Sequence, residues 1–161
     1  MSVGIVSDEE KLYRRVPADP TLYRVENDAV RVSTIAFNDR NNAVSVDRAL
    51  LCNHDPKHTQ KSSTDGILVL IAQDVRAIDS VRSEGVDVGA NRAKKDITYI
   101  FDVKHAPIKG DSASPSNIAH AVIIPTPDYA NNSAFKKLKE RLALLVSNKS
   151  WSETWEIEPS K

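Results

Sequence analysis

The sequence predicts a single α+β domain built around a mixed, mainly antiparallel sheet. Two observations carry this prediction: short apolar or alternating stretches typical of strands recur along the chain, and only two stretches have helical periodicity. The chain has 161 residues, which is about one domain by the usual prior of ~150 residues. We expect residues 1–11 to form a flexible arm and residues 12–161 to form the domain.

The first half of the domain is expected to consist of strands joined by turns. Lys11–Val16 has the pattern of a short strand that ends at Pro17. Residues 30–37 and 43–46 alternate in polarity, and the polar NDRNN sequence between them indicates a turn, so the two stretches predict a hairpin. Residues 52–65 show no apolar periodicity and are expected to form a loop.

The second half begins with the unbroken apolar run at 66–72, which is typical of a central strand covered on both faces. Helical spacing over 73–83 predicts a short helix directly after this strand. Two further strands are expected at 97–103 and 118–124. The apolar stripe over 133–146 predicts an amphipathic C-terminal helix capped by its first residue, a serine. The tail after it is expected either to add an edge strand or to cover a groove.

Charge and cysteine content exclude several classes of function. Lys and Arg number 22 and Asp and Glu number 22, so the net charge is zero, and we expect no nucleic-acid partner. The longest apolar run is far too short to cross a bilayer, and we expect no membrane role. Cys52 is the single cysteine, which excludes an internal disulfide and fits a reducing compartment, so the expected location is cytoplasmic.

Motifs for cofactors and metals are missing from the sequence. It contains no GxGxxG, GxxxxGK, HExxH or GxSxG pattern, and we expect no cofactor. Cys52, His54 and His58 are residue types that bind zinc, but their spacing matches no standard zinc motif, and Lys57 and Lys61 place positive charge beside them. We therefore expect no metal site and interpret these residues as part of a solvated loop.

A single histidine within the strand predicted at 118–124 is the candidate catalytic residue. His120 has apolar neighbours on both sides, and a buried imidazole needs a hydrogen-bond partner. Two interpretations stay open. His120 is either a core residue bonded to Asp102 or to a loop carbonyl, or a general acid or base at the mouth of the sheet.

Polar side chains on the amino-terminal strands form a candidate anion-binding site. Adjacent Arg14 and Arg15 face opposite sides of a strand, so one can be exposed while the other is paired or lines a cleft. Arginine binds phosphate and carboxylate groups with two parallel hydrogen bonds, and nearby serines can complete such a pocket. The alternative is a buried ion pair with Asp47 or Asp102. The candidate residues are Arg14, Arg15, Ser33, Ser45 and Arg48.

The succession LYRR, STIAF, SVDR and NIAHAVI resembles that of a group of small uncharacterised prokaryotic proteins. The Tyr-Arg strand followed by a Ser-Thr strand is also similar to ADP-ribosyltransferase and RES-type domains. That resemblance implies that Arg14 or Arg15 holds the pyrophosphate of NAD and that Ser33 or Thr34 lies near its nicotinamide ribose. The chain departs from these domains because it has no glutamate motif on a late strand.

These observations favour a cytoplasmic protein that binds another protein as an accessory component of a bacterial multi-protein system. Its charge is balanced, its catalytic set is incomplete, and Trp151 and Trp155 in the tail would suit an exposed interface unless they cover the protein's own core. The alternative is a small nucleotide-binding or ADP-ribosyltransferase-like enzyme with an Arg/Ser/His cleft. That alternative requires Arg15 and His120 to face one cavity.

Overall fold

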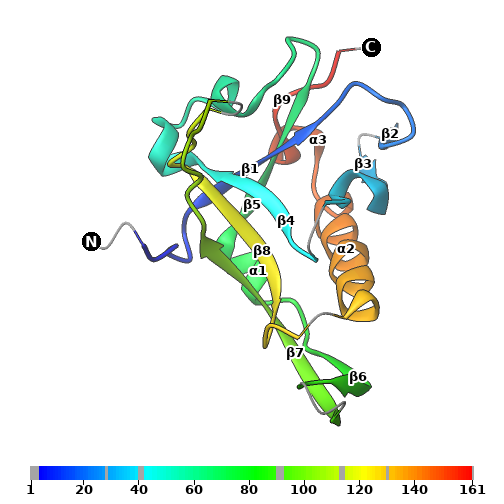
Figure 1. The fold of residues 1–161 in the computed structure, drawn as a ribbon. Helices are drawn as coiled ribbons and strands as arrows, with labels where there is room; N and C mark the ends of the chain where they lie inside the picture. Colours follow the sequence, from blue (N-terminus) through cyan, green and yellow to red (C-terminus); the bar gives the residue numbers. More distant parts are fainter. Residues whose placement is uncertain are drawn as a thin grey trace.

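The computed structural model describes residues 4–27, 29–39, 42–89, 93–112, 115–129 and 131–160. It has the predicted α+β fold, with a large antiparallel sheet, a short helix after one of its buried strands and a longer C-terminal helix (Figure 1). The strands of the large sheet are β1 (Lys11–Val16), β4 (Val44–Arg48), β5 (Gly66–Ile71), β6 (Val81–Asp87), β7 (Lys94–His105), β8 (His120–Thr126) and β9 (Trp155–Ile157). The other elements are β2 (Tyr23–Glu26), β3 (Ala29–Val32), the 3-10 helices η1 (Thr34–Phe37), η2 (Ala49–Cys52) and η3 (Pro56–Thr59), and the helices α1 (Ala72–Arg76), α2 (Asn132–Ser147) and α3 (Trp151–Thr154).

The seven strands are ordered β6-β7-β8-β4-β1-β5-β9, and each neighbouring pair is antiparallel. The short helix α1 follows β5 and also packs against β7, although β8, β4 and β1 lie between these two strands. The sheet is therefore strongly curved. Its inner face and α2 enclose the main hydrophobic core, which includes Leu12, Leu70, Ile123, Leu138 and Leu142.

The outer face of the sheet is covered by loops rather than by a long helix. Tyr13, Ile67 and Val69 point to this side and pack against Ala49 and Cys52 of η2. Side chains of β1 alternate between the two faces, as expected for a strand. The predicted loop at 52–65 thus lies on the outer face of the sheet, and its residues 56–59 form η3.

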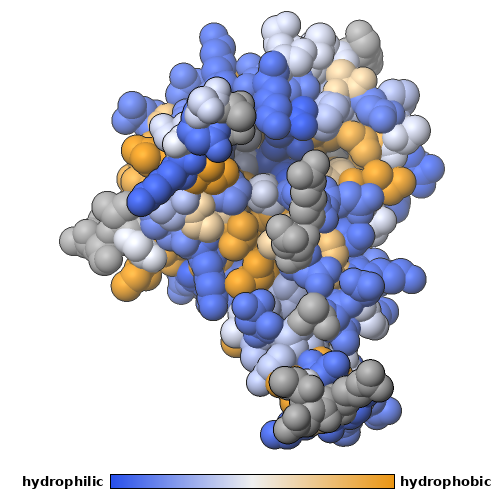
Figure 2. Space-filling model, in the orientation of Figure 1, coloured by the Kyte–Doolittle hydropathy of each residue, from blue (hydrophilic) through white to orange (hydrophobic). Residues whose placement is uncertain are grey.

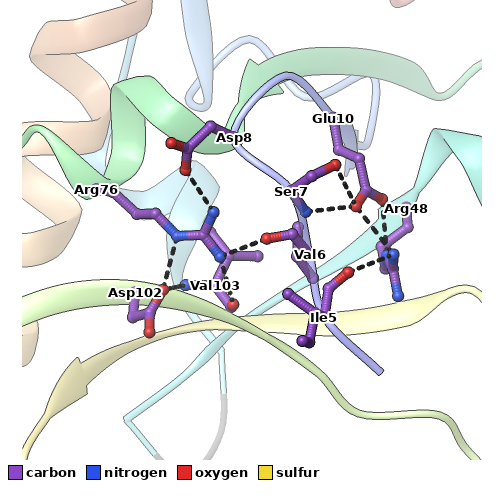
Figure 3. A network of polar contacts seen from close by, with 9 residues as sticks. All are labelled: Ile5, Val6, Ser7, Asp8, Glu10, Arg48, Arg76, Asp102 and Val103. Carbon is purple, nitrogen blue, oxygen red and sulfur yellow. Dashed lines mark hydrogen bonds and ion pairs between the residues drawn. The ribbon is translucent and has the colours of Figure 1, made fainter. Parts of the chain in front are cut away.

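The segment before β1 was expected to be flexible, but its described residues pack against the sheet. Val6 is buried, and Arg76 donates hydrogen bonds to the Val6 carbonyl oxygen and to Asp8, both at 2.7 Å (Figure 3). The same guanidinium contacts Asp102 at 2.9 Å and the Val103 carbonyl oxygen at 3.3 Å on β7. Arg76 therefore joins α1, β7 and the amino-terminal segment.

A second, buried arginine also binds the amino-terminal segment. Arg48 is 1 % exposed and forms two hydrogen bonds with Glu10, at 2.8 and 2.9 Å. Arg48 also donates to the carbonyl oxygen of Ile5 at 3.1 Å (Figure 3). Residues of the segment 4–10, which the sequence predicts as part of a flexible arm, are thus joined to the sheet and to α1 by ion pairs and hydrogen bonds.

The hairpin predicted from residues 30–37 and 43–46 is not formed. β3 pairs with β2 in a separate ribbon, whereas β4 pairs with β1 and β8. The chain leaves β3 at Ser33, whose hydroxyl accepts a hydrogen bond from the Ile35 amide and caps η1. Burial of Ala36 and Phe37 stabilises this turn, so tertiary packing outweighs the alternating pattern.

Two helix boundaries and one strand position also differ from the predictions. The helix predicted over 73–83 is limited to α1, because residues 81–87 pair with β7 as strand β6. Asn131 rather than Ser133 caps α2, through a hydrogen bond from the Ala134 amide at 2.8 Å. The apolar strand β5 lies between β1 and β9, and β4 occupies the middle of the sheet.

The carboxyl-terminal tail closes one edge of the sheet. β9 forms the predicted edge strand, and Trp155 is only 7 % exposed, with its ring 5.7 Å from that of Tyr23. Trp155 therefore covers the protein's own core, which corrects the expectation of an exposed interface residue, and the Trp151 side chain lies outside the described part. None of the helices in the described ranges has the length and apolar composition needed to cross a membrane.

Candidate functional site

A cavity of about 500 Å³ opens where β1 and β4 separate. These strands pair only through Leu12 with Arg48 and Tyr13 with Asp47, and they diverge beyond this point (Figure 1). Because the sheet is split there, side chains from both faces of β1 border one space. We call this cavity the split-sheet pocket; its polar lining includes Arg14, Arg15, Ser45, Asp47, Thr59, Lys61, Asn117 and His120.

The split-sheet pocket brings together four of the predicted site residues, Arg14, Arg15, Ser45 and His120. The other two anion-binding candidates lie elsewhere. Ser33 caps η1 and borders a separate cavity beside the β2–β3 ribbon, and Arg48 is buried in its pair with Glu10. Arg15 and His120 therefore meet the requirement that they face one cavity.

Arg14 is fully engaged by the protein. Its guanidinium donates to the carbonyl oxygens of Ala36, Asn38 and Ser45 and to the carboxylate of Asp39, at distances from 2.9 to 3.2 Å. These contacts use all of the N–H donors that an arginine has. Burial lowers the pKa of Arg14, and the Asp39 carboxylate opposes this effect. Arg14 is therefore a structural anchor, although the sequence placed it among the anion-binding candidates.

Most of the N–H donors of Arg15, in contrast, have no partner among the described residues. Its side chain forms one ion pair among the described residues, with Asp65 at 3.4 Å, and is 34 % exposed. Asp65 also accepts hydrogen bonds from the amides of Lys61 and Ser62, at 3.0 and 2.9 Å. Burial opposes ionisation of Asp65, but these amides and Arg15 outweigh it and lower the pKa of the carboxyl group. Arg15 and the exposed Lys61 side chain thus supply accessible positive charge.

Asp47 ties two loops to the sheet beside Arg15. It is 7 % exposed and accepts hydrogen bonds from the Thr59 hydroxyl and the Asn117 amide, both at 2.8 Å. The Asn117 side-chain oxygen in turn accepts from His58 Nε2 at 3.2 Å. Asp47 was predicted as a partner for a buried arginine, whereas its partners are loop residues. Thr59 and Asn117 carried no signal in the sequence, because single polar residues in loops have no periodicity.

His120 has the loop-carbonyl hydrogen bond of the structural interpretation and also lines the split-sheet pocket. Its Nδ1 lies 2.7 Å from the carbonyl oxygen of Ala106. A carbonyl oxygen can only accept, so Nδ1 donates this hydrogen bond, and Nε2 has no hydrogen-bond partner among the described residues. The bond to Ala106 holds the ring in place, as in the structural interpretation, and the ring also lines the split-sheet pocket. Its Nε2 can accept a hydrogen bond or a proton from a ligand.

The loop residues considered as zinc ligands have partners of other kinds. The Cys52 thiol is buried and donates to the carbonyl oxygens of Arg48 and Ala49 at 3.4 and 3.6 Å. Burial, reinforced by Asp47, raises the pKa of Cys52 to about 11. His54 is exposed, in a left-handed backbone conformation with φ of 55°. Across the described ranges, no group of three or more His, Cys, Asp or Glu side chains is placed to hold a metal ion.

Comparison with known proteins gives no further assignment. No protein-family model, curated protein or solved structure matches the chain. Function is therefore inferred from the residues of the split-sheet pocket.

Proposed function

We propose that the protein binds a small anionic ligand in the split-sheet pocket. The observation that carries this proposal is the contrast between two adjacent arginines: Arg14 has every donor occupied, whereas Arg15 has donors available in the same cavity. A volume of about 500 Å³ falls within the range of ~300–1,000 Å³ that is usual for small-ligand sites.

Three polar side chains would contact the ligand directly. Arg15 can bind a phosphate or carboxylate through two parallel hydrogen bonds, and Lys61 adds a second positive charge at the same wall. His120 Nε2 can accept from a hydroxyl of the ligand or take a proton from it. The acidic residues that line the pocket in the described part are Asp39 and Asp47, and both are already hydrogen-bonded. Ligand binding, rather than glutamate-dependent ADP-ribosyl transfer, is therefore the function that we propose.

A protein partner in a bacterial multi-protein system and a cytoplasmic location stay predictions from the sequence. The partner prediction rests on balanced charge, an incomplete catalytic set and exposed tryptophans, and of these Trp155 is buried against Tyr23. Small-anion binding ranks first because it has a cavity and an available arginine to support it.

The test is binding of inorganic phosphate and pyrophosphate to the full chain, measured by isothermal titration calorimetry and by thermal shift. We expect Arg15→Gln to weaken binding by roughly 10- to 100-fold, since charge-assisted hydrogen bonds are lost. The matched control is Arg82→Gln, because Arg82 is exposed on β6 and pairs with Asp96 outside the pocket. Absence of binding to the unmodified protein, or equal losses in the two variants, would contradict the proposal.

A further inference from the structure

Two isoleucines expose apolar surface inside the split-sheet pocket. Ile35 is 52 % exposed and Ile108 is 41 % exposed, and both line the cavity that contains Arg15 and His120. Exposure alone does not distinguish them, since hydrophobic residues on the face drawn in Figure 2 form several small groups separated by hydrophilic ones. What distinguishes Ile35 and Ile108 from other exposed hydrophobic residues is that they line the same cavity as Arg15.

Ile35 is held in this position by the structure around it. The 3-10 helix η1 buries Ala36 and Phe37 and leaves Ile35 facing outward. Its amide is capped by Ser33, and the carbonyl oxygen of Ala36 accepts two hydrogen bonds from Arg14, at 3.2 and 3.1 Å. Hydrogen bonds from both sides of η1 therefore hold Ile35 in its exposed position.

Ile108 is fastened by different residues. It forms a two-bond bridge with Asn117, in which each amide donates to the other residue's carbonyl oxygen at 2.9 Å. The Asn117 side chain is in turn anchored to Asp47 at 2.8 Å. The structural anchors of the pocket, Arg14 and Asp47, thus each support one exposed isoleucine.

We infer that the ligand carries an aromatic ring in addition to its anionic group, as an aromatic phosphomonoester or a nucleoside monophosphate does. This inference rests on the proposed function. Isoleucine side chains are stiff, so Ile35 and Ile108 present fixed apolar walls, and a rigid ring covers such walls with little loss of conformational freedom. In this arrangement Arg15 and Lys61 bind the phosphate while the ring lies against Ile35 and Ile108. A cavity of about 500 Å³ has room for both parts.

Four probes test the ring by calorimetry on the full chain: inorganic phosphate, ribose 5-phosphate, phenyl phosphate and AMP. We expect phenyl phosphate and AMP to bind about tenfold more tightly than ribose 5-phosphate, since covering on the order of 60 Å² of apolar surface corresponds to that change in Kd. Hexyl phosphate is the comparison for an alkyl chain. If it binds as tightly as phenyl phosphate, the ring is overturned in favour of a chain.

Substitutions of Ile35 and Ile108 test whether these residues cause the tighter binding of AMP. Ile35→Ser and Ile108→Ser are each expected to weaken AMP binding about three- to tenfold and to leave phosphate binding unchanged. The matched control is Ile100→Ser, because Ile100 is 56 % exposed on β7 and does not line the pocket. The ring is overturned, and the proposed function stands, if phosphate binds through Arg15 but AMP binds no more tightly than ribose 5-phosphate. The same conclusion follows if Ile100→Ser weakens AMP binding as much as Ile35→Ser does. If no probe binds, both are overturned.

Discussion

Arg14 on β1 donates a hydrogen bond from Nη1 to the carbonyl oxygen of Ser45 on β4, at 2.9 Å. The backbones of these strands no longer pair at this point, so a side chain replaces a bond of the β-ladder. The same guanidinium binds the carbonyl oxygens of Ala36 and Asn38 and thereby holds η1 at the edge of the opening. One largely buried side chain, 12 % exposed, therefore bridges the split in the sheet, whereas its neighbour Arg15 is paired only with Asp65 among the described residues.

Replacement of Arg14 is expected to destabilise the protein far more than the same replacement of Arg15. A lysine at position 14 cannot span the separate carbonyl groups, and Arg14→Lys should lower the free energy of unfolding by about 2–4 kcal/mol, since several part-buried carbonyl oxygens lose their donors. Arg15→Lys should cost less than about 1 kcal/mol, because the ion pair of Arg15 with Asp65 is partly exposed. Urea denaturation of both variants measures the difference. Equal costs would show that Arg14 does not hold the opening.

The elements predicted correctly are those with a strong local signal. β1 has the expected bounds, Lys11–Val16, because Pro17 ends it, and α2 follows from the spacing of Phe135, Leu138 and Leu142. The hairpin failed because alternation identifies a strand but not its partner. β4 pairs with β1 and with β8, and neither lies next to it in the sequence.

The site was predicted only as far as residue chemistry allows. Arg15, Ser45 and His120 were found because arginine, serine and histidine next to predicted strands are chemically informative. The difference between Arg14 and Arg15 was not predictable, since it depends on the carbonyl groups of η1, a turn that the alternating pattern concealed. Asn117 was missed because its role comes from a contact with Asp47, 70 residues away.

The buried pair of Glu10 and Arg48 is expected to make stability depend on pH in the acid range. Burial opposes ionisation of Glu10, but hydrogen bonds from Arg48 and Ser7 outweigh it and lower its pKa below 4.5. Because the folded state has the lower pKa, the stabilisation is complete above 4.5 and is lost as the pH falls through the folded-state value.

Glu10→Gln should therefore lose about 3–5 kcal/mol at neutral pH and show a flatter stability profile below 4.5. The exposed neighbour supplies the control, Glu9→Gln, which should retain the wild-type profile. Chemical denaturation at a series of pH values measures both. An unchanged acid slope in Glu10→Gln would show that other carboxylates cause it.

His105 is expected to add a second pH dependence at higher pH. Its Nδ1 is buried without a partner in the described part of the chain. Burial lowers the pKa of His105 below 6.5, Arg48 and His120 contribute in the same direction, and Glu10 opposes them. Since the folded state resists protonation, the free energy of unfolding is highest above 6.5 and falls as the pH drops from 6.5 toward the folded-state pKa.

A side chain that cannot be protonated removes this slope. His105→Gln should therefore flatten the stability profile just below 6.5 and leave the Glu10-dependent region below 4.5 intact. His54→Asn is the control, because His54 is exposed and asparagine tolerates its left-handed backbone. If both histidine variants keep the wild-type slope, a different group titrates in this range.

The tail that covers β5 depends on a glycine. A Cβ atom at Gly66 would lie 2.7 Å from Pro159 Cδ and 2.7 Å from Trp155 Cζ3. Gly66→Ala should therefore displace the tail and cost about 1–3 kcal/mol, as overpacked sites do. Gly89→Ala is the control, since a Cβ there meets nothing within 4 Å. Urea denaturation should separate the two variants, and equal midpoints would show that the tail yields without cost.

Two substitutions of His120 should separate its structural bond from its contact with the ligand. In His120→Asn the side-chain amide can still donate to the Ala106 carbonyl, in place of Nδ1, but nothing replaces Nε2. This variant should keep most of its stability and bind phosphate several-fold more weakly.

In His120→Gln the longer amide reaches the position of Nε2 and gives up the bond to Ala106. We therefore expect stability to fall by about 1–2 kcal/mol and phosphate binding to be better retained than in His120→Asn. Denaturation and calorimetry on the same preparations test both. If His120→Asn binds phosphate as the wild type does, the imidazole serves only to hold the loop at Ala106, and the anion is bound by Arg15 and Lys61 alone.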